Sequence, residues 1–408
     1  MAAPISFLTA NRIRSIDVAR GLTVLVMLFV NDLAGVTGAP GWMKHISPST
    51  ADGYTFVDLV FPAFLFIVGL SLPIALEKRL GRGESKIRIA GHILTRTLSL
   101  LLMGVLMVNT ESIASNGHID PRLWQLLFYG SAVMIWLASG AERRRIVWAR
   151  RIIGIVILAA LAFAYRSEGG AGLRPHWWGI LGLIGWSYLV TALLYLVIRR
   201  RPAGFAAAII LLYLLYFADR TGQLAFLGPL SPWIGIASVL GSQPAITASG
   251  TLLSILLFST DQPLAVRLRT IFLFALILGT IAVLLHSLSN LSPLFIYNKN
   301  AATPPWCLIS SAWTALLFAL IYWIVDGRGL TTGTRMLATA GQNALFAFIL
   351  GPIFYLLIGM LPVMADGRSL YGMLGAGFAT GFWRSLIFAL AGTWLTAAMQ
   401  RSGRYLRI

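Results

Sequence analysis

Long apolar stretches separated by short polar and basic segments fill most of this chain. A helix that crosses a bilayer needs about 20 mostly apolar residues, and the pattern predicts twelve such helices. They cover residues 19–37, 54–76, 92–109, 122–139, 152–165, 179–198, 203–218, 245–259, 270–288, 305–325, 337–361 and 382–400. Two parts of the pattern are weaker. The run 152–165 is short, and prolines and glycines interrupt 219–245, which we interpret as a re-entrant or interfacial excursion.

Basic residues are distributed unevenly over the connections between these helices. Counting alternate connections from the N-terminus places 23 Lys and Arg on one side and seven on the other. Positive residues accumulate in cytoplasmic loops, so the richer side is predicted to be cytoplasmic. This asymmetry predicts an all-α polytopic membrane protein with twelve spans and both termini in the cytoplasm. We also expect the first helix to be retained, because its apolar run continues into Asn31 and Asp32 without a convincing cleavage site.

Composition narrows the class further. The 408 residues are 58% hydrophobic and only 11% charged, whereas soluble domains carry about 25% charged residues. The net charge of +18 sits in short clusters between apolar runs, so it indicates membrane orientation and not a nucleic-acid partner. The single cysteine, Cys307, excludes an intramolecular disulfide, and no metal-ligand spacing occurs among the five histidines. We expect one membrane domain over residues 1–408, surrounded by lipid, with no metal.

Polar residues within spans are costly and therefore point to function. Asn31 and Asp32 lie near the outer end of the first span, and Asp58 lies at the outer start of the second. The short loop between them contains His45, so Asn31, His45 and Asp58 can converge on the outer side. A structural interpretation is also open. Asp32 would then mark a wet helix end, Asp58 would cap a helix beside Thr55, and His45 would be a surface residue.

The residue strings around these positions carry a family resemblance. The most specific part is 14–76. It contains Arg14-Ser15-Ile16-Asp17, Phe29-Val30-Asn31, Lys44-His45, the segment from Thr55 to Pro62, and Phe66-Ile67-Val68-Gly69. Later matches are Val108-Asn109, Asn298-Lys299-Asn300 and Gly341-Gln342-Asn343. The chain resembles the heparan-alpha-glucosaminide N-acetyltransferase family over nearly its whole length, and looks most like the bacterial NagX-type members.

This resemblance implies a fold, a reaction and a location. The family core has ten spans, so two of the twelve predicted here would form an added helical hairpin within 120–220. The implied reaction moves acetyl from cytoplasmic acetyl-CoA to an amino sugar, in a bacterial inner membrane and with a homodimer as the possible assembly. The chain departs from the family after His45, where Ile46-Ser47-Pro48 replaces a Trp-containing string, and after Asn300, where five residues precede Trp306.

Acetyl transfer to an amine requires a base or an acyl relay and a donor for the tetrahedral oxyanion. His45 can accept a proton near neutral pH or carry the acetyl group. Asp58 can fix the imidazole tautomer, and the Asn31 amide can donate to the oxyanion. The resemblance places the family's reactive histidine at Lys44-His45. The residues alone leave direct transfer and an acetyl-histidine intermediate equally open.

Other polar positions support cofactor contacts less directly. Lys299, flanked by Asn298 and Asn300, lies in a largely uncharged outer loop and can contact an anionic cofactor or a sugar hydroxyl. Asn343 within an apolar helix either joins helices or lines a pore. Arg20 is predicted to bind the cofactor or to pair with Asp17. His92, His118, His176 and His286 have no carboxylate partner in the sequence pattern, so we interpret them as structural.

Together these patterns predict a transmembrane, histidine-dependent N-acetyltransferase. It would take acetyl-CoA from the cytoplasm and a glucosamine-type amine as acceptor. An amino-sugar or N-acetylglucosamine transporter is the alternative, because twelve spans with polar residues in the bundle also suit alternating access. A transporter would not need the His45, Asp58 and Asn31 trio near one face.

Overall fold

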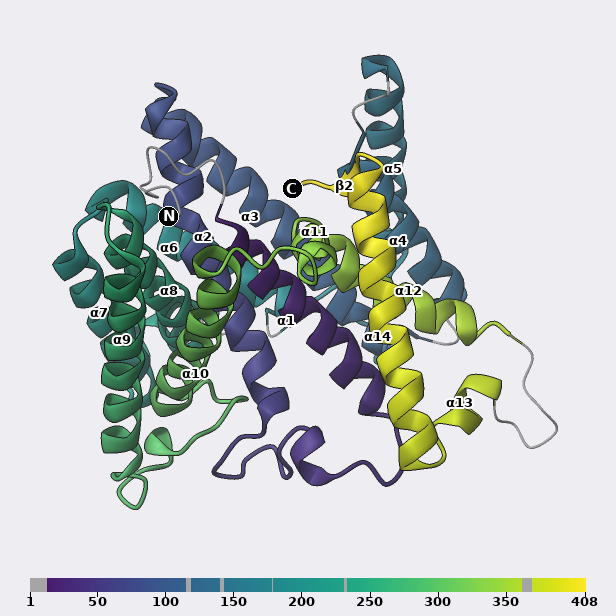
Figure 1. Ribbon diagram of the computed structural model, residues 1–408. Coiled ribbons are helices and arrows are strands. Elements are labelled where there is room, and N and C mark those ends of the chain that lie inside the picture. Colours follow the sequence, from purple (N-terminus) through teal and green to yellow (C-terminus); the bar gives the residue numbers. More distant parts are fainter. Residues whose placement is uncertain (1–12, 115–118, 140–142, 178, 231–232, 362–368) are drawn as a thin grey trace.

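The structure, a computed structural model, describes residues 13–114, 119–139, 143–177, 179–230, 233–361 and 369–408. These residues form a helical bundle with one small two-stranded sheet (Figure 1). The α-helices are α1 (Arg14–Leu33), α2 (Val60–Gly81), α3 (Lys86–Asn109), α4 (Pro121–Trp136), α5 (Arg144–Ala164), α6 (Ile180–Ile198), α7 (Pro202–Arg220), α8 (Gln243–Phe258), α9 (Leu264–His286), α10 (Pro304–Tyr322), α11 (Arg335–Gly341), α12 (Ala344–Ile358), α13 (Leu370–Leu374) and α14 (Phe378–Arg401). The strands β1 (Leu137–Ser139) and β2 (Arg404–Leu406) pair antiparallel.

Each of the twelve predicted apolar runs falls on a helix or a helix pair, which confirms the all-α polytopic class. Within the described residues, nine helices are long and apolar enough to cross a membrane, and α11 with α12 counts as a tenth if that pair is one span. The pair bends by 86°. Helix α1 carries Asp17, Arg20 and Asp32, and α4 has 16 residues, so these two do not meet the same criteria. The total of twelve spans and the cytoplasmic termini stay predictions.

Two close helix contacts organise the centre of the bundle. Helix α2 crosses α8 at Gly69 and Gly250, and α1 crosses α11 at Gly21 and Gly341. A Cβ atom at Gly69 would lie 1.9 Å from the Thr247 carbonyl oxygen, and one at Gly21 would lie 1.9 Å from the Leu337 carbonyl oxygen. Small residues let helix backbones approach this closely in a bilayer, where lipid offers no hydrophobic drive for association. These glycines therefore fix α1 and α2, the helices that carry the predicted site.

The interrupted stretch 219–245 divides into two parts. A 3-10 helix, η4 (Ala225–Leu230), follows α7, and a π-helix, η5 (Ile236–Ser242), then runs directly into α8. The Asp219 carboxylate accepts a hydrogen bond from Ala237 N at 3.0 Å, which holds the start of η5. The span Ile236–Phe258 is largely buried in the bundle. The excursion is thus shorter than predicted, because residues 236–244 belong to the span that the sequence pattern began at 245.

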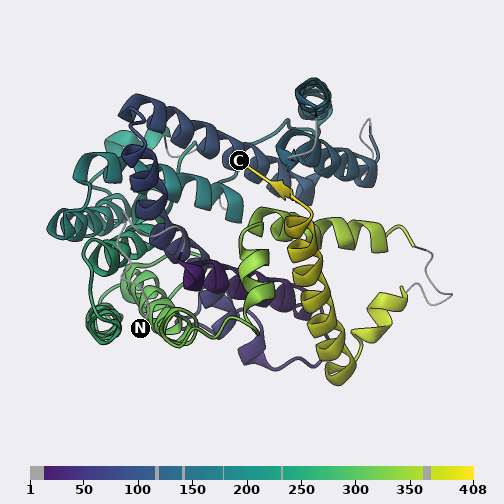
Figure 2. The same cartoon turned by 45° about the horizontal axis from the view of Figure 1, so that its top comes forward.

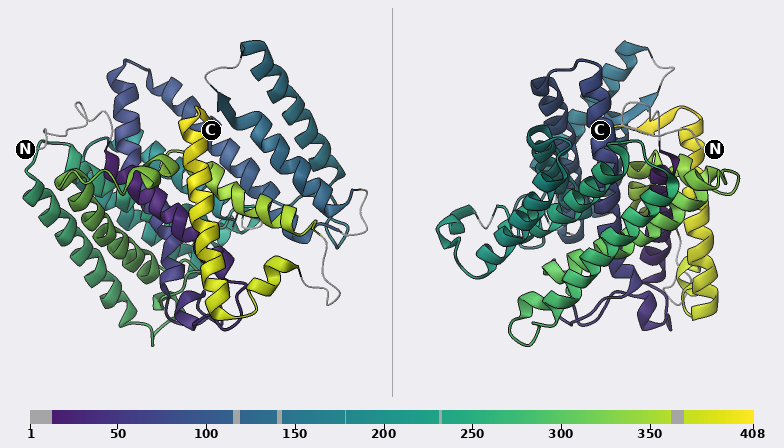
Figure 3. Two further views of the ribbon diagram at one scale, coloured as in Figure 1. Left: turned by 45° about the vertical axis from the view of Figure 1, so that its right-hand side comes forward. Right: turned by 60° about the vertical axis from the view of Figure 1, so that its left-hand side comes forward.

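Helices α4 and α5 pack against each other at the edge of the bundle, far from α7 and α9 (Figures 2 and 3). Few residues of α5 are buried in this structure. The pair lies within 120–220, where an added hairpin is predicted. Its status as an addition to the family core stays a prediction.

The Asp32 side chain is buried and hydrogen-bonded to several side chains, so the interpretation that it marks a solvent-exposed helix end is wrong. Its carboxylate accepts hydrogen bonds from Tyr355 Oη at 2.9 Å, Tyr371 Oη and Ser385 Oγ at 2.6 Å, and Arg384 Nε at 3.1 Å. The side chains of Asp32 and Arg384 are 1% and 9% exposed. This cluster joins the C-terminal end of α1 to α12, α13 and α14, and so fixes the end of the helix that carries Asn31.

Replacing Asp32 by asparagine should destabilise the protein by about 3 kcal/mol or more, because it leaves the buried Arg384 without its counter-charge. The thermal unfolding midpoint of the purified variant measures this effect. Glu84→Gln is the control, since Glu84 pairs with Arg79 at 2.8 Å in a more exposed position, where such pairs contribute little. Equal midpoints for the two variants would show that the Asp32 cluster does not hold α1.

Candidate active site

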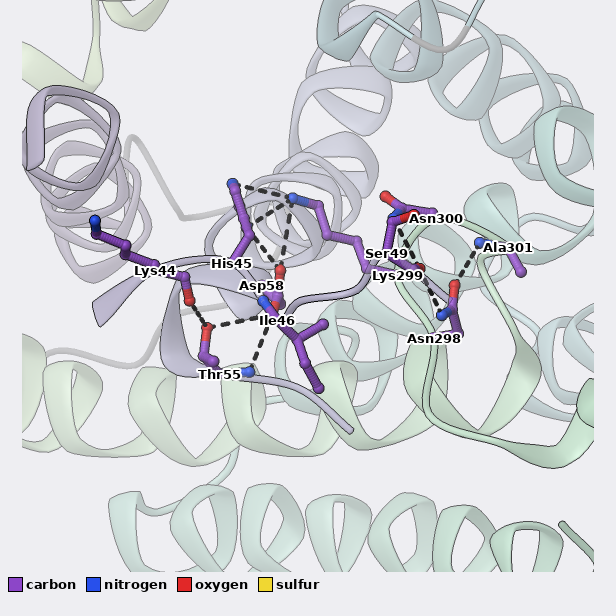
Figure 4. Close-up of polar contacts among 10 residues, drawn as sticks. All are labelled: Lys44, His45, Ile46, Ser49, Thr55, Asp58, Asn298, Lys299, Asn300 and Ala301. Carbon is purple, nitrogen blue, oxygen red and sulfur yellow. Dashed lines mark hydrogen bonds and ion pairs between the residues drawn. The ribbon is translucent and has the colours of Figure 1, made fainter. Parts of the chain in front are cut away.

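The segment between α1 and α2 brings His45 against Asp58, as the sequence predicted (Figure 4). Their Nδ1 and Oδ1 atoms lie 2.7 Å apart, and the His45 side chain is 51% exposed whereas Asp58 is 1% exposed. With Nδ1–H donating to the carboxylate, the tautomer is fixed and Nε2 keeps its lone pair. The pair thus keeps Nε2 on a half-exposed ring and buries the carboxylate that orients it.

Asp58 also caps the second span, as the structural interpretation of this residue states, while its catalytic role stays a prediction. It lies in the 3-10 helix η2 (Phe56–Leu59), which leads into α2. Its Oδ2 atom accepts from Thr55 N at 3.0 Å and from Ile46 N at 3.2 Å, leaving Oδ1 for His45. The Thr55 hydroxyl donates to the Lys44 carbonyl oxygen at 2.8 Å. The Asp58 carboxylate therefore caps the start of η2 and also binds the backbone of the loop, which places His45 beside it.

Lys299 reaches the same point from the loop between α9 and α10. Its Nζ atom lies 3.2 Å and 3.4 Å from the Nδ1 and Nε2 atoms of His45 and 3.7 Å from Asp58 Oδ1 (Figure 4). Burial lowers the pKa of the Lys299 ammonium, and the Asp58 carboxylate opposes that shift. The structure thus adds a cation to the predicted trio, at a residue that the sequence pattern had assigned to cofactor contact.

The two asparagines beside Lys299 hold its loop in place. Asn298 Nδ2 donates to the carbonyl oxygens of Ser49 and Ala51 at 2.9 and 3.1 Å, and its Oδ1 accepts from Ala301 N at 2.8 Å. Asn300 Nδ2 also donates to Ser49 O, at 3.0 Å. The contacts of Asn298 are made within the protein, which gives it a positioning role for Lys299. Cofactor binding by these asparagines stays a prediction.

A second histidine, His286, has a carboxylate partner that the sequence pattern did not show, and its contacts agree with the predicted structural role. Its Nε2 lies 2.8 Å from Asp52 Oδ2, and its ring stacks on Tyr297. Asp52 Oδ1 accepts from Tyr297 N at 2.8 Å. This pair ties the 45–53 segment to the Lys299 loop. His118 lies outside the described residues.

A cavity of about 560 Å³ connects this cluster to the opposite end of the bundle. We call the end at His45 the outer end and the opposite end the inner end, after the predicted orientation. At the outer end its lining includes Asn31, His45 and Lys299, whereas Asp58, the third member of the predicted trio, is buried. Its middle is mostly apolar, with residues such as Phe64 and Val68 of α2. The cavity therefore joins a polar outer end to the inner end through an apolar passage.

Four cations line the inner end of this cavity: Arg20, Lys78, Arg96 and Arg407. Arg20 lies 3.5 Å from Asp17, so the ion-pair interpretation of Arg20 and its access to the cavity both hold. The Arg96 guanidinium lies 4.9 Å from the centre of the Tyr188 ring. The sequence pattern placed Lys78 and Arg407 on this side without selecting them as site residues, and Arg96 accompanies the Val108-Asn109 family match.

Arg407 reaches the cavity because the last residues of the chain are fixed. Strand β2 pairs with β1, and the Asn343 Oδ1 atom accepts from Leu406 N at 3.0 Å. Residues 405–408 line the inner end of the cavity. Asn343, at the bend between α11 and α12, thus joins two segments, as one of its two predicted interpretations states. Its predicted cofactor contact stays a prediction, and its neighbours Gln342 and Ala344 line the cavity.

Comparison with known proteins supports the resemblance found in the sequence. A family profile described as a domain of unknown function, DUF5009, matches residues 12–202. Heparan-alpha-glucosaminide N-acetyltransferase of Mus musculus is 27% identical over 384 residues, which cover 84% of this chain and 53% of the mouse protein. The protein of the same name from Homo sapiens is 40% identical over 114 residues, which cover 28% of this chain and 15% of the human protein.

The chain thus spans about half the length of the mouse relative. The 12–202 match includes the segment that carries His45 and Asp58, while the longer alignment extends the similarity over most of the bundle. A closer relation to NagX-type members stays a prediction. Over most of its length the chain is thus similar to heparan-alpha-glucosaminide N-acetyltransferases, with the DUF5009 profile matching its first half.

Proposed function

We propose that this protein is a transmembrane N-acetyltransferase that moves acetyl from cytoplasmic acetyl-CoA to the amine of a glucosamine-type sugar. The observation that carries the proposal is one cavity with cations at one end and the His45–Asp58 pair with Lys299 at the other. Acetyl-CoA is itself a long molecule with phosphates at one end and a thioester at the other. Its charge distribution therefore matches the cavity.

The length of the passage agrees with a threaded donor. Arg20 and Asn31 lie on α1 at opposite ends of the cavity lining, 11 residues apart. At 1.5 Å per residue this separation is about 17 Å along the helix axis. The nucleotide phosphates would contact Arg20, Lys78, Arg96 and Arg407, and the pantetheine arm would extend through the apolar middle. The thioester would then reach His45 without the nucleotide crossing the membrane.

The side chains at the outer end supply each group that acetyl transfer requires. His45 Nε2 takes the proton of the acceptor amine, or attacks the thioester carbonyl and passes the acetyl group on. In both routes the carbon–sulfur bond breaks, CoA leaves as a thiol, and an amide forms on the sugar. Asp58 stabilises the imidazolium, as in the orienting part of a catalytic triad. The Lys299 ammonium and the Asn31 amide are the donors for the oxyanion.

An amino-sugar transporter is the alternative class. The buried carboxylate that fixes the His45 tautomer supports the enzyme, because a transport pathway has no need for an oriented base at one face. The similarity to two N-acetyltransferases supports the same conclusion. We further propose a bacterial inner membrane as the location and a homodimer as the assembly, both on the resemblance alone.

The proposal predicts that the purified protein acetylates glucosamine when given acetyl-CoA labelled in the acetyl group. Labelled N-acetylglucosamine, separated by chromatography, is the measured product. Glucose is the matched control acceptor, since it has the same ring without the amine, and it should stay unlabelled. If glucosamine also stays unlabelled while CoA binds, the acceptor class or the reaction is wrong.

A further inference from the structure

The loop between α9 and α10 is hydrogen-bonded to the segment 49–53 of the connection between α1 and α2. Gly53 N donates to the Tyr297 carbonyl oxygen at 2.9 Å, and Tyr297 N donates to Asp52 Oδ1 at 2.8 Å. The two asparagines that flank Lys299 donate to backbone carbonyls of the same segment (Figure 4). The position of Lys299 therefore depends on where the segment 49–53 lies.

His286, the last residue of α9, holds these two joined segments to the helix. Its Nε2 atom lies 2.8 Å from Asp52 Oδ2, and the rings of His286 and Tyr297 stack with their centroids 4.2 Å apart. Because the other Asp52 oxygen accepts from Tyr297 N, this carboxylate contacts the helix end and the loop together. We call the pair of Asp52 and His286 the clasp.

The clasp lies outside the space where acetyl transfer is proposed. Neither of its residues lines the cavity at His45, nor a second cavity of about 1170 Å³ that also has Lys299 in its wall. The side chains of Asp52 and His286 are 40% and 32% exposed, so neither is a buried core residue. An effect of the clasp on the reaction therefore passes through the residues that it places.

Lys299 is the residue through which the clasp can act. Its Nζ atom lies 3.2 Å and 3.4 Å from the two ring nitrogens of His45, at the upper end of hydrogen-bond lengths. The Tyr297 backbone that Asp52 holds is two residues away along the chain. A shift of about 1 Å in a group that acts on the reacting atoms can lower a rate about 10²-fold. A small displacement of this loop would thus separate the ammonium from the histidine.

We propose that the clasp is a positioning element for acetyl transfer, which sets the distance between Lys299 Nζ and His45 and thereby the turnover. The inference rests on the proposed function for the reaction itself. It adds Asp52 and His286 to the residues on which the reaction depends, as positioning residues that act through Lys299.

Turnover of His286→Ala at saturating acetyl-CoA and glucosamine tests the proposal on the purified full-length protein. It should fall about tenfold, whereas the KM for acetyl-CoA should stay within about twofold, because the proposed donor contacts line the other end of the cavity. His286→Gln offers an amide N–H to Asp52 and should recover most of the lost turnover. Asn290→Ala, exposed in the same loop and outside both cavities, is the matched control and should leave turnover unchanged.

A Lys299→Met background separates positioning from a general structural role. Without the ammonium the clasp has no Nζ atom to place, so adding His286→Ala should leave the remaining turnover nearly unchanged. A clasp that only supports the fold would lower turnover by the same factor in both backgrounds, and this result would overturn the inference. Wild-type turnover in a folded His286→Ala variant would overturn it as well.

Amine labelling gives a readout that does not depend on turnover. An amine-reactive reagent should modify Lys299 several-fold faster in His286→Ala, because the amine leaves its contacts with His45 and Asp58. Mass spectrometry of the labelled peptide measures the rate. Lys44 is the internal control, since its Nζ atom donates to a backbone carbonyl at 3.0 Å and not to the clasp, and its rate should stay the same. An unchanged Lys299 rate would refute the inference, including where Lys299→Met has no measurable turnover.

Asp52→Asn replaces His286→Ala if that variant does not fold. It keeps an oxygen for Tyr297 N but removes the charge that faces His286, so it should lower turnover and raise Lys299 labelling. Wild-type values for both quantities would refute the inference. If the wild type transfers no acetyl group to glucosamine, the proposed function fails, and the labelling rate still tests whether the clasp places Lys299.

Discussion

His45→Ala should lower acetyl transfer by about 10³-fold or more while CoA binding stays within a few-fold of the wild type. The imidazole is the base or the acyl carrier in both proposed routes, and removing such a group costs about 10²–10⁴-fold or abolishes turnover. The proposed phosphate contacts of the donor are at the other end of the cavity, which Arg20 and its neighbours line. Labelled product formation measures the first quantity and calorimetry with CoA the second.

The matched control for this variant is His92→Ala. His92 is exposed on α3 and lines neither cavity, so its removal should leave turnover unchanged. The pair of variants also separates the two classes, because a transporter should keep substantial uptake without the His45 ring. Near wild-type acetylation by His45→Ala would show that His45 has no catalytic role and is a loop residue beside a polar helix end.

Asp58→Asn should lower turnover by about 10²-fold or more with little effect on donor binding. Asparagine keeps the size of the side chain and one oxygen for the Thr55 and Ile46 amides, but it removes the charge that stabilises the imidazolium. The amide can also present its NH₂ group to His45 and reverse the tautomer. The turnover number at saturating acetyl-CoA measures the effect.

Capping and orientation by Asp58 are separated by a second variant. Thr55→Val removes the hydroxyl that joins Lys44 O to the helix start but leaves the His45–Asp58 contact. It should lower the unfolding midpoint more than the turnover, whereas Asp58→Asn should do the reverse. Normal turnover in a folded Asp58→Asn variant would show that Asp58 only caps the helix and does not support catalysis.

The helices could be predicted from the sequence because the bilayer imposes a simple requirement. Each span must satisfy its backbone internally and present apolar side chains, so twelve apolar runs marked twelve helical regions. The predicted start of the span Ile236–Phe258 was wrong because its first residues, which form η5, are buried by neighbouring helices and not by lipid. Hydropathy does not distinguish those two environments. The bend between α11 and α12 likewise depends on packing.

The His45–Asp58 pair could be predicted because a short loop forces consecutive spans to be neighbours. The contact of Lys299 with His45 spans 254 residues, and that of His286 with Asp52 spans 234 residues. Such contacts follow from how α9 and α10 pack, which no local pattern encodes. The position of Arg407 in the cavity lining also depends on packing, because β2 pairs with β1 and Leu406 N donates to Asn343 Oδ1.

The most direct measurement is sided acetylation in sealed membrane vesicles of known orientation that contain the protein. Acetyl-CoA is supplied either to the cytoplasmic face or to the outer face, with glucosamine on the outer face in both cases. The account predicts labelled product only when the donor is on the cytoplasmic face, where Arg20, Lys78, Arg96 and Arg407 line the cavity. Equal product from donor on either face would contradict a donor threaded through the bundle to His45.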